Sequence, residues 1–165
     1  MAPGSVLNAR VDTDLQHLRR AIDLAARARE KGNHPFGSLL VDADGAVVLE
    51  AENTVLTTSD CTAHAELNLV RAASRELDPA VLRASTLYTS TEPCAMCAGA
   101  IFWAGIGRVV FALSSATLGT IVHDESGDWT LAVSCREVFA RGGRTVDVSG
   151  PLLETEGRTV HDGFW

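Results

Sequence analysis

Side chains that could hold a catalytic metal stand in two short groups. The chain carries His-Ala-Glu at 64–66 and Pro-Cys-Ala-Met-Cys at 93–97. The imidazole of His64 and the thiolates of Cys94 and Cys97 would give zinc three protein ligands and leave the fourth tetrahedral position to water, as in catalytic sites; structural sites close all four. Glu66 adds a carboxylate that could take a proton from that water. The two groups therefore predict a hydrolytic zinc site with Glu66 as its acid–base residue.

Two other interpretations of these groups are open from the sequence. A C-x-x-C pair alone is also typical of a redox site, and an H-x-E triplet alone is common by chance. A purely structural zinc would need a fourth ligand, for which Cys61 is the only close candidate. We expect Cys61 and Cys135 to be small buried thiols instead. A non-catalytic zinc module would also leave Glu66 without a role, so the combination favours catalysis.

Hydrophobic periodicity and turn residues predict an alternating α/β chain. We expect helices at 13–30, 62–77, 94–104, 131–141 and 151–161, strands at 38–41, 46–51, 85–89, 108–113 and 145–148, and a long loop at 114–128. The first two strands form a hairpin turned at Asp44-Gly45, and strands separated by a full helix can run parallel. The expected fold is α/β, a three-layer α-β-α arrangement around a mixed five-stranded sheet with strands four and five parallel.

Both metal-binding groups fall at predicted helix starts. The histidine and glutamate lie in the first turn of one helix and the two cysteines in the first turn of the next, where Pro93 takes the first helical position. The partial positive charge of a helix N-terminus favours thiolate over thiol. Residues 64 and 66 are about 200° apart around a helix, so we expect the Glu66 carboxylate to reach the water from a different side than the imidazole.

The charge composition argues against a nucleic-acid partner. The 165-residue chain has a net charge of −7 and a single lysine, Lys31, whereas binding to a phosphate backbone needs a concentrated basic surface. We interpret the arginines of the first helix as a solvated face; they are Arg19, Arg20, Arg27 and Arg29. The expected partner is a small-molecule substrate.

Length and cysteine use fit one enzyme domain over residues 1–165. No apolar run approaches the roughly 18 residues of a membrane span, and the N-terminus lacks a basic segment followed by an apolar one, so we expect neither a membrane anchor nor a secretory signal. The four cysteines, two of them in the motif, suit a reducing cytoplasm better than a disulfide framework. The expected location is the cytoplasm.

Longer stretches around the two groups resemble the cytidine and deoxycytidylate deaminase superfamily, whose zinc nucleobase deaminases share H-x-E with P-C-x-x-C. The resemblance runs from Asn33 to Phe111. It is carried by His-Pro-Phe-Gly at 34–37, Glu-Asn at 52–53, Thr-Ala-His-Ala-Glu at 62–66 and Leu-Tyr-Thr-Ser-Thr-Glu-Pro-Cys-Ala-Met-Cys at 87–97. Within the superfamily the chain is most similar to bacterial guanine deaminases and next to tRNA adenosine deaminases.

The resemblance implies a cytidine-deaminase-like fold, Zn²⁺ as cofactor, and hydrolytic replacement of an amino group by a carbonyl with release of ammonia. The implied substrate is a free nucleobase or nucleoside, with guanine the first candidate. The alternatives are a tRNA-specific adenosine deaminase, or a deaminase of cytosine or another amino-heterocycle. A basic groove beside the zinc would support RNA, whereas an enclosed neutral or acidic pocket would support a free base.

The resemblance also implies a base-binding set. Asn53 would hydrogen-bond the base, Phe36 would pack on its ring, and the backbone near Ala63 and Gly37 would contact its edge. From the residues alone, Asn53 could instead cap a strand end and Phe36 could belong to the core.

The likeness fades after residue 111, in the region where related enzymes carry an acidic residue that assists proton transfer or substrate choice. Asp124 and Asp128 are the candidates for that residue here. Three aromatic residues also lie in this loop or at the end of the chain: Trp129, Phe164 and Trp165. Either they dock a helix, or they form a lid over the substrate, given by the same or a neighbouring subunit.

A homodimer is expected from the helix at 94–104. Its far end carries an apolar stretch that would need burial, with Ala100, Ile101, Trp103 and Ile106 exposed. The resemblance points the same way, because members of the superfamily usually pair through this region.

Overall fold

The computed structural model describes residues 3–122 and 131–165, with side chains from residue 10 onward. The helices are α1 (Pro3–Glu30), α2 (Val55–Thr58), α3 (Ala65–Glu76), α4 (Pro79–Ala84), α5 (Ala95–Ala104), α6 (Ser115–Gly119), α7 (Cys135–Ala140) and α8 (Glu154–Thr159). The strands are β1 (Gly37–Val41), β2 (Val47–Glu52), β3 (Thr86–Thr91), β4 (Arg108–Leu113) and β5 (Asp147–Ser149).

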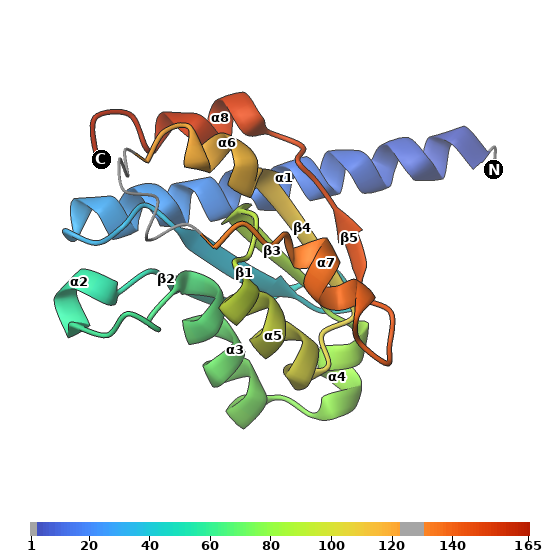
Figure 1. The fold of residues 1–165 in the computed structure, drawn as a ribbon. Helices are drawn as coiled ribbons and strands as arrows, with labels where there is room; N and C mark the ends of the chain where they lie inside the picture. Colours follow the sequence, from blue (N-terminus) through green and yellow to red (C-terminus); the bar gives the residue numbers. More distant parts are fainter. Residues whose placement is uncertain (1–2, 123–130) are drawn as a thin grey trace.

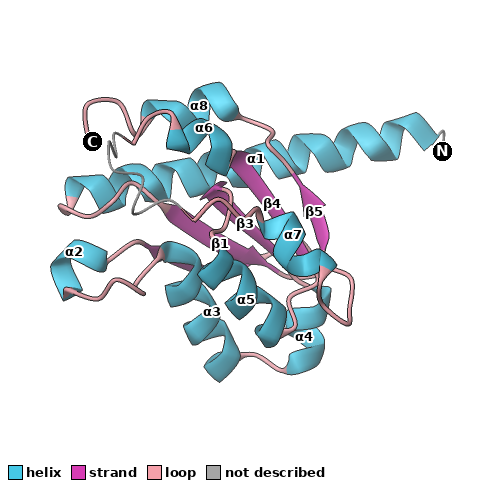
Figure 2. Cartoon of the chain, in the orientation of Figure 1, coloured by secondary structure: helices cyan, strands magenta, loops and turns pink. Residues whose placement is uncertain are grey.

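The strands form one mixed five-stranded sheet in the order β2-β1-β3-β4-β5. Strand β1 pairs antiparallel with β2 and β3, while β3 with β4 and β4 with β5 are parallel. Helices α1 and α8 cover one face and α3 and α5 the other, with α7 packed beside α5 (Figures 1 and 2). The predicted three-layer fold, including the parallel fourth and fifth strands, is confirmed. Among the described residues no helix is both long and apolar enough to cross a membrane.

Each face of the sheet has its own apolar core. The core under α3, α5 and α7 includes Leu69, Leu87, Ile101 and Phe111, while the core under α1 includes Leu18, Leu39 and Val110. Burial of each such side chain contributes roughly 1.5 to 3 kcal/mol. Strand β4, which is parallel to both of its neighbours, supplies Val109 and Phe111 to the first core and Val110 and Ala112 to the second, as expected of a parallel strand covered by helices on both faces.

Several element bounds differ from those predicted, and local capping explains most of the differences. Ser134 and Glu137 form a reciprocal capping box, so α7 begins at Cys135 and not at 131. The expected loop at 114–128 contains α6, because the Ser114 side chain accepts a hydrogen bond from the Thr117 amide. Helix α4 was not predicted; it begins at Pro79, a residue that fits the first position of a helix.

Two glycines allow the backbone geometry of the first strands. Gly45 has φ +85° in the turn of the β1–β2 hairpin, where the Asp42 carboxylate accepts from the amides of Asp44 and Ala46. A Cβ on Gly37 would lie 2.4 Å from Leu24 Cβ, so only glycine lets β1 start this close to α1. The predicted hairpin turn is confirmed.

Two burial expectations were wrong. Ile101 and Ile106 are fully buried and belong to the core, so only Trp103, 85% exposed, projects from the far end of α5. Helix α5 is apolar almost all round because it packs on both α3 and α7. Cys61 is exposed, since it lies in the turn between α2 and α3, whereas Cys135 is buried as expected.

Candidate active site

The two metal-binding groups begin neighbouring helices. His64 is the N-cap of α3 and Cys94 the N-cap of α5, and neither side chain makes a capping hydrogen bond. Both side chains are therefore available as metal ligands. Pro93 precedes the cap and does not occupy the first helical position, which corrects the sequence prediction by two residues. Because α3 and α5 pack side by side, their starts bring the two groups together (Figure 1).

The three predicted ligands converge on one point. The ligand atoms of His64, Cys94 and Cys97 all lie within 4.8 Å of one another. Each sulfur is 3.6 Å from His64 Nδ1. A tetrahedral zinc with ordinary Zn–S and Zn–N bonds places a sulfur and a nitrogen about 3.6 Å apart. The separations and the donor types thus fit zinc, with Nδ1 as the ligand nitrogen. Within the described residues no fourth protein ligand joins this group.

Glu66 lies against the same group. Its side chain is buried at 6% exposure, and Oε2 is 3.7 Å from Cys97 Sγ. The Thr89 hydroxyl donates to Oε1 at 3.3 Å and is itself 3.0 Å from the Ser38 hydroxyl. Burial raises the pKa of the Glu66 carboxyl. A carboxyl whose pKa lies nearer neutrality is better suited to accept and return a proton.

The pKa values of the two ligand thiols shift in opposite directions. A hydrogen bond from Cys97 lowers the pKa of Cys94 to about 4, against the opposing effect of burial and with further help from His64. The same hydrogen bond, together with burial, raises the pKa of Cys97. Zinc takes both cysteines as thiolates, so binding at this group would release the remaining proton.

Two of the residues expected to bind the base lie in loops next to the first two strands: Phe36 directly precedes β1, and Asn53 directly follows β2. Asn53 is 1% exposed. Its backbone N–H donates to the Phe36 carbonyl at 3.0 Å, and its side-chain Oδ1 accepts from Val55 N at 3.0 Å. Its Nδ2 is buried and has no partner in the described part of the chain. Because the bond from Val55 N fixes the orientation of the side-chain amide, Nδ2 remains a buried donor without an acceptor among the described residues. A residue that only capped a strand end would not need such a donor, so the arrangement favours base binding.

The backbone of Ala63 and Gly37 is already engaged. Ala63 N donates to Asp60 O and its carbonyl accepts from Thr54 N, both at 3.0 Å. Gly37 N donates to the Ser90 hydroxyl at 3.2 Å. These bonds hold the two loops, and the close approach to Leu24 already requires glycine at position 37.

The C-terminal segment packs on the residues before β1 in the same chain. The Trp165 ring centroid is 5.3 Å from that of His34 and 6.3 Å from that of Phe36, while Phe164 lies 5.9 Å from His34. Burial, with a smaller effect of the His64 charge, lowers the pKa of His34 in this aromatic cluster. Trp165 remains 39% exposed, so it covers the cluster without being enclosed by it.

Three predicted site residues, Asp124, Asp128 and Trp129, lie outside the described residues. Three residues that the sequence did not single out also contribute to the site or lie near it. Thr89 and Glu92 stand inside the motif at 87–97 but have no spacing signal of their own. Glu92 accepts from the amides of Ser115 and Cys135, tying α6 and α7 to the end of β3. His161 is buried four residues from the C-terminus, where only tertiary packing reveals it.

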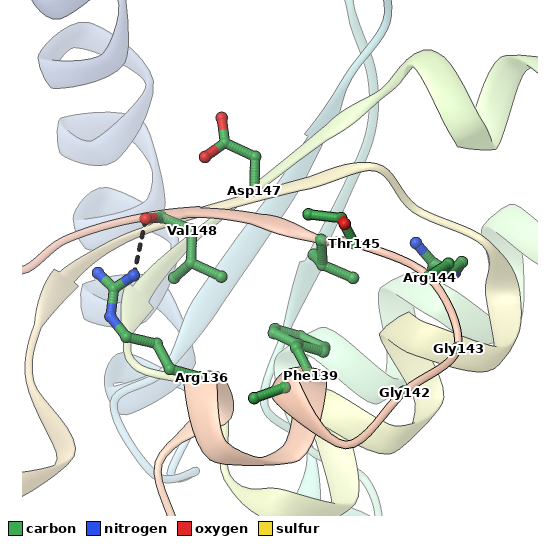
Figure 3. A pocket seen from close by; sticks show the side chains of 10 residues that line it. Arg136, Phe139, Gly142, Gly143, Arg144, Thr145, Asp147 and Val148 are labelled. Atoms are coloured by element: carbon green, nitrogen blue, oxygen red, sulfur yellow. Dashed lines mark hydrogen bonds between the residues drawn. The ribbon is translucent and has the colours of Figure 1, made fainter.

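A hollow of about 790 Å³ lies between α7 and β5, away from the metal group (Figure 3). Its polar groups serve the fold: Arg136 donates to the carbonyls of Val148 and Gly150, and Arg144 donates to those of Phe102 and Ile106. The residues that line it include none of the metal group. This hollow therefore has no part in the chemistry of the site.

Known proteins with this arrangement identify the family. Residues 11–113 match the cytidine and deoxycytidylate deaminase zinc-binding region. A probable cytosine deaminase of Schizosaccharomyces pombe is 40% identical over 157 residues, or 93% of each chain, so the likeness does not stop at residue 111. A tRNA-specific adenosine deaminase of Haemophilus influenzae is 39% identical over 68% of this chain and 65% of its own. A guanine deaminase from Nitrosomonas europaea has a solved structure similar at TM-score 0.73 and 25% identity, over 88% of this chain and 80% of that one. The chain belongs to the cytidine and deoxycytidylate deaminase family of zinc-dependent hydrolytic enzymes.

Proposed function

We propose that this enzyme deaminates a free nucleobase, with guanine as the first candidate substrate. The observation that carries the proposal is the contact between the metal group and Glu66, whose Oε2 is 3.7 Å from Cys97 Sγ. The unpaired Asn53 Nδ2 and the adjacent Phe36 supply a hydrogen-bond donor and a ring face for a planar heterocycle. The C-terminal rings over His34 and Phe36 support a site enclosed by the chain itself.

The residues divide the work of amino-group hydrolysis. His64, Cys94 and Cys97 would hold a zinc ion, which when bound would supply the Lewis acid that lowers the pKa of water toward neutrality. Glu66 takes one proton of the attacking water at a carboxylate oxygen and gives it to a ring nitrogen. It then takes the second proton, from the hydroxyl group added to the ring, and gives it to the amino group, which leaves as ammonia while the carbonyl forms. Thr89 keeps Oε1 in place through its hydroxyl. Asn53 Nδ2 orients the base, and Phe36 packs on the ring.

The surface charges support a small substrate over RNA. The basic side chains at the end of α1 are paired with carboxylates: Arg20 with Glu50 at 2.6 Å and Lys31 with Glu52 at 2.6 Å, while Arg27 approaches both acids. Arg19 pairs with Glu156 at 2.9 Å. These pairs leave no concentrated basic strip on α1 for a phosphate backbone.

Cytosine is the second candidate. The relative aligned over 93% of both chains carries the name of a cytosine deaminase, and its alignment includes the C-terminal half, where substrate choice is expected to lie. The acidic residue that would separate the two bases, Asp124 or Asp128, lies outside the described residues.

One assay tests the proposal. Zinc-loaded enzyme is incubated with guanine, cytosine, adenine, their nucleosides and a tRNA, and released ammonia is measured. Turnover of a free base is expected, with guanine first. Ammonia from tRNA alone, with binding that weakens steeply as salt rises, would overturn the proposal in favour of an RNA-modifying enzyme.

A further inference from the structure

His161 is a buried histidine that the proposed mechanism does not use. It is 1% exposed and lies just after α8, where the chain turns toward its end. Trp165 Nε1 donates to His161 Nδ1 at 3.2 Å, and the two rings are nearly parallel at 14°. Because an indole nitrogen can only donate, Nδ1 must be an acceptor, so the neutral ring carries its proton on Nε2.

That Nε2–H has no acceptor. The atom is buried and makes no hydrogen bond within the described residues. Burial, reinforced by the nearby Arg29, lowers the pKa of His161 to about 4, so the ring stays neutral near pH 7 and Nε2 remains a donor. A buried donor without an acceptor is uncommon in folded proteins and calls for an explanation, such as a ligand atom that completes it.

The position of His161 points to that ligand. Its ring centroid is 5.3 Å from that of Phe36, and the Phe36 carbonyl accepts from the backbone N–H of Asn53 at 3.0 Å. Two buried nitrogen donors without acceptors, Asn53 Nδ2 and His161 Nε2, therefore accompany one aromatic residue. Trp165, which stacks on His161, also packs on His34 and Phe36, with ring centroids 5.3 and 6.3 Å away.

We infer that His161 reads the substrate: its Nε2–H donates to an acceptor atom of the base, a carbonyl oxygen or an unprotonated ring nitrogen, while Trp165 holds the ring in the donor tautomer. The inference rests on the proposed function and narrows it to amino-heterocycles with an acceptor for each donor, one for Asn53 and one for His161. Guanine and cytosine both carry a ring carbonyl and at least one unprotonated ring nitrogen. Trp165 is then a positioning residue, and His161 a specificity residue.

The test compares three full-length, zinc-loaded variants by kcat/KM on the base that the wild-type enzyme deaminates fastest. His161→Leu removes the donor and is expected to lower kcat/KM at least about tenfold, equivalent to about 1.4 kcal/mol. His161→Gln keeps an N–H and is expected to recover part of that loss. His17→Leu is the matched control, because His17 packs on Tyr88 on the α1 face of the sheet, the face opposite to α3 and α5, and should leave kcat/KM unchanged.

A second measurement needs no change at His161. In uniformly ¹⁵N-labelled Glu66→Gln enzyme, the His161 Nε2–H resonance is expected to shift when guanine or cytosine binds. A resonance that stays fixed while the Asn53 side-chain amide shifts would overturn the inference, as would His161→Leu with kcat/KM within twofold of wild type. Absence of ammonia from every free base would instead refute the proposed function. If tRNA is then the substrate, the same variants assayed on tRNA decide whether His161 contacts the base.

Discussion

Glu66 on α3 and Cys97 on α5 lie in contact, with Oε2 of the carboxylate 3.7 Å from the sulfur. The two residues are 31 positions apart, and only the packing of one helix start against the other brings them together. The second carboxylate oxygen is held by Thr89 from β3. A base fixed at one oxygen and placed beside a metal ligand at the other can move protons without itself binding the metal.

The first prediction follows from that geometry. Glu66→Gln is expected to lower kcat by about 10² to 10⁴, the usual contribution of a general acid–base group. Zinc content and the thermal midpoint should stay near wild type, because glutamine keeps the size of the side chain and can still accept from Thr89. Steady-state kinetics with metal analysis checks this, and Glu76→Gln, at the exposed end of the same helix, is the control. Near-normal turnover in Glu66→Gln would remove Glu66 from the mechanism.

The second prediction concerns the metal. Purified enzyme is expected to hold one zinc per chain, and Cys94→Ser to lose most of it, because a hydroxyl is a far poorer zinc ligand than a thiolate. Cys61→Ser is the matched control, since its thiol is exposed and outside the metal group. Elemental analysis after removal of loosely bound metal gives the answer. Full zinc retention in Cys94→Ser would contradict the assignment.

The sequence predicted the site better than its surroundings. His64, Cys94 and Cys97 could be assigned because zinc demands particular ligand types, and that demand is visible as spacing. The sheet followed from the period of apolar residues and from the Asp44-Gly45 turn. The exposure of α5 could not be predicted, because Ile101 and Ile106 are buried by neighbours distant in sequence. The same holds for His161, whose role depends on Trp165 and Phe36 folding over it.

The third prediction is a dependence of stability on pH. Asp14 is 4% exposed and accepts two bonds from Arg108, at 2.8 and 2.6 Å, and one from Tyr88. Burial alone would raise the pKa of Asp14, but these hydrogen bonds outweigh it and lower the pKa below its ordinary value. The stability they contribute is therefore present above about pH 4 and is lost as the pH falls through the folded-state pKa.

Asp14→Asn is accordingly expected to lower the free energy of unfolding at pH 7 by roughly 3 kcal/mol, the usual cost of breaking a buried ion pair. The difference from wild type should shrink as the pH falls below about 4. Urea unfolding at a series of pH values measures it. Asp23→Asn, exposed on the same helix, should change stability by less than about 0.5 kcal/mol. A constant difference across the pH range would show that lost packing, and not charge, is responsible.

The fourth prediction is a homodimer that depends on Trp103. This side chain is 85% exposed at the end of α5, and a second copy of the chain would bury it. Sedimentation at micromolar concentration is expected to show a dimer, and Trp103→Ser to shift the enzyme toward monomer with zinc retained. Leu152→Ser changes an exposed apolar residue near α8, on the other side of the molecule, and should leave the dimer intact. A wild-type monomer would refute this prediction.

The last prediction concerns the C-terminal rings. Phe164 is partly buried beneath the Arg29 guanidinium, which lies 5.8 Å from its centroid, and Trp165 is 39% exposed over His34 and Phe36. Burial of such partly exposed rings contributes roughly 1 to 2 kcal/mol each, so the rings also stabilise the C-terminal segment. Their place over His34 and over Phe36, which is proposed to pack on the base, suits exclusion of bulk water from the reacting base. Deleting Phe164 and Trp165 is expected to raise KM or lower kcat while zinc content stays unchanged.

Trp165→Phe separates the two roles of the last residue, since it keeps a ring to exclude water and removes only the N–H that holds His161. If the truncated enzyme keeps wild-type kinetics and merely melts at a lower temperature, the C-terminal segment is a structural clasp and does not cover the substrate.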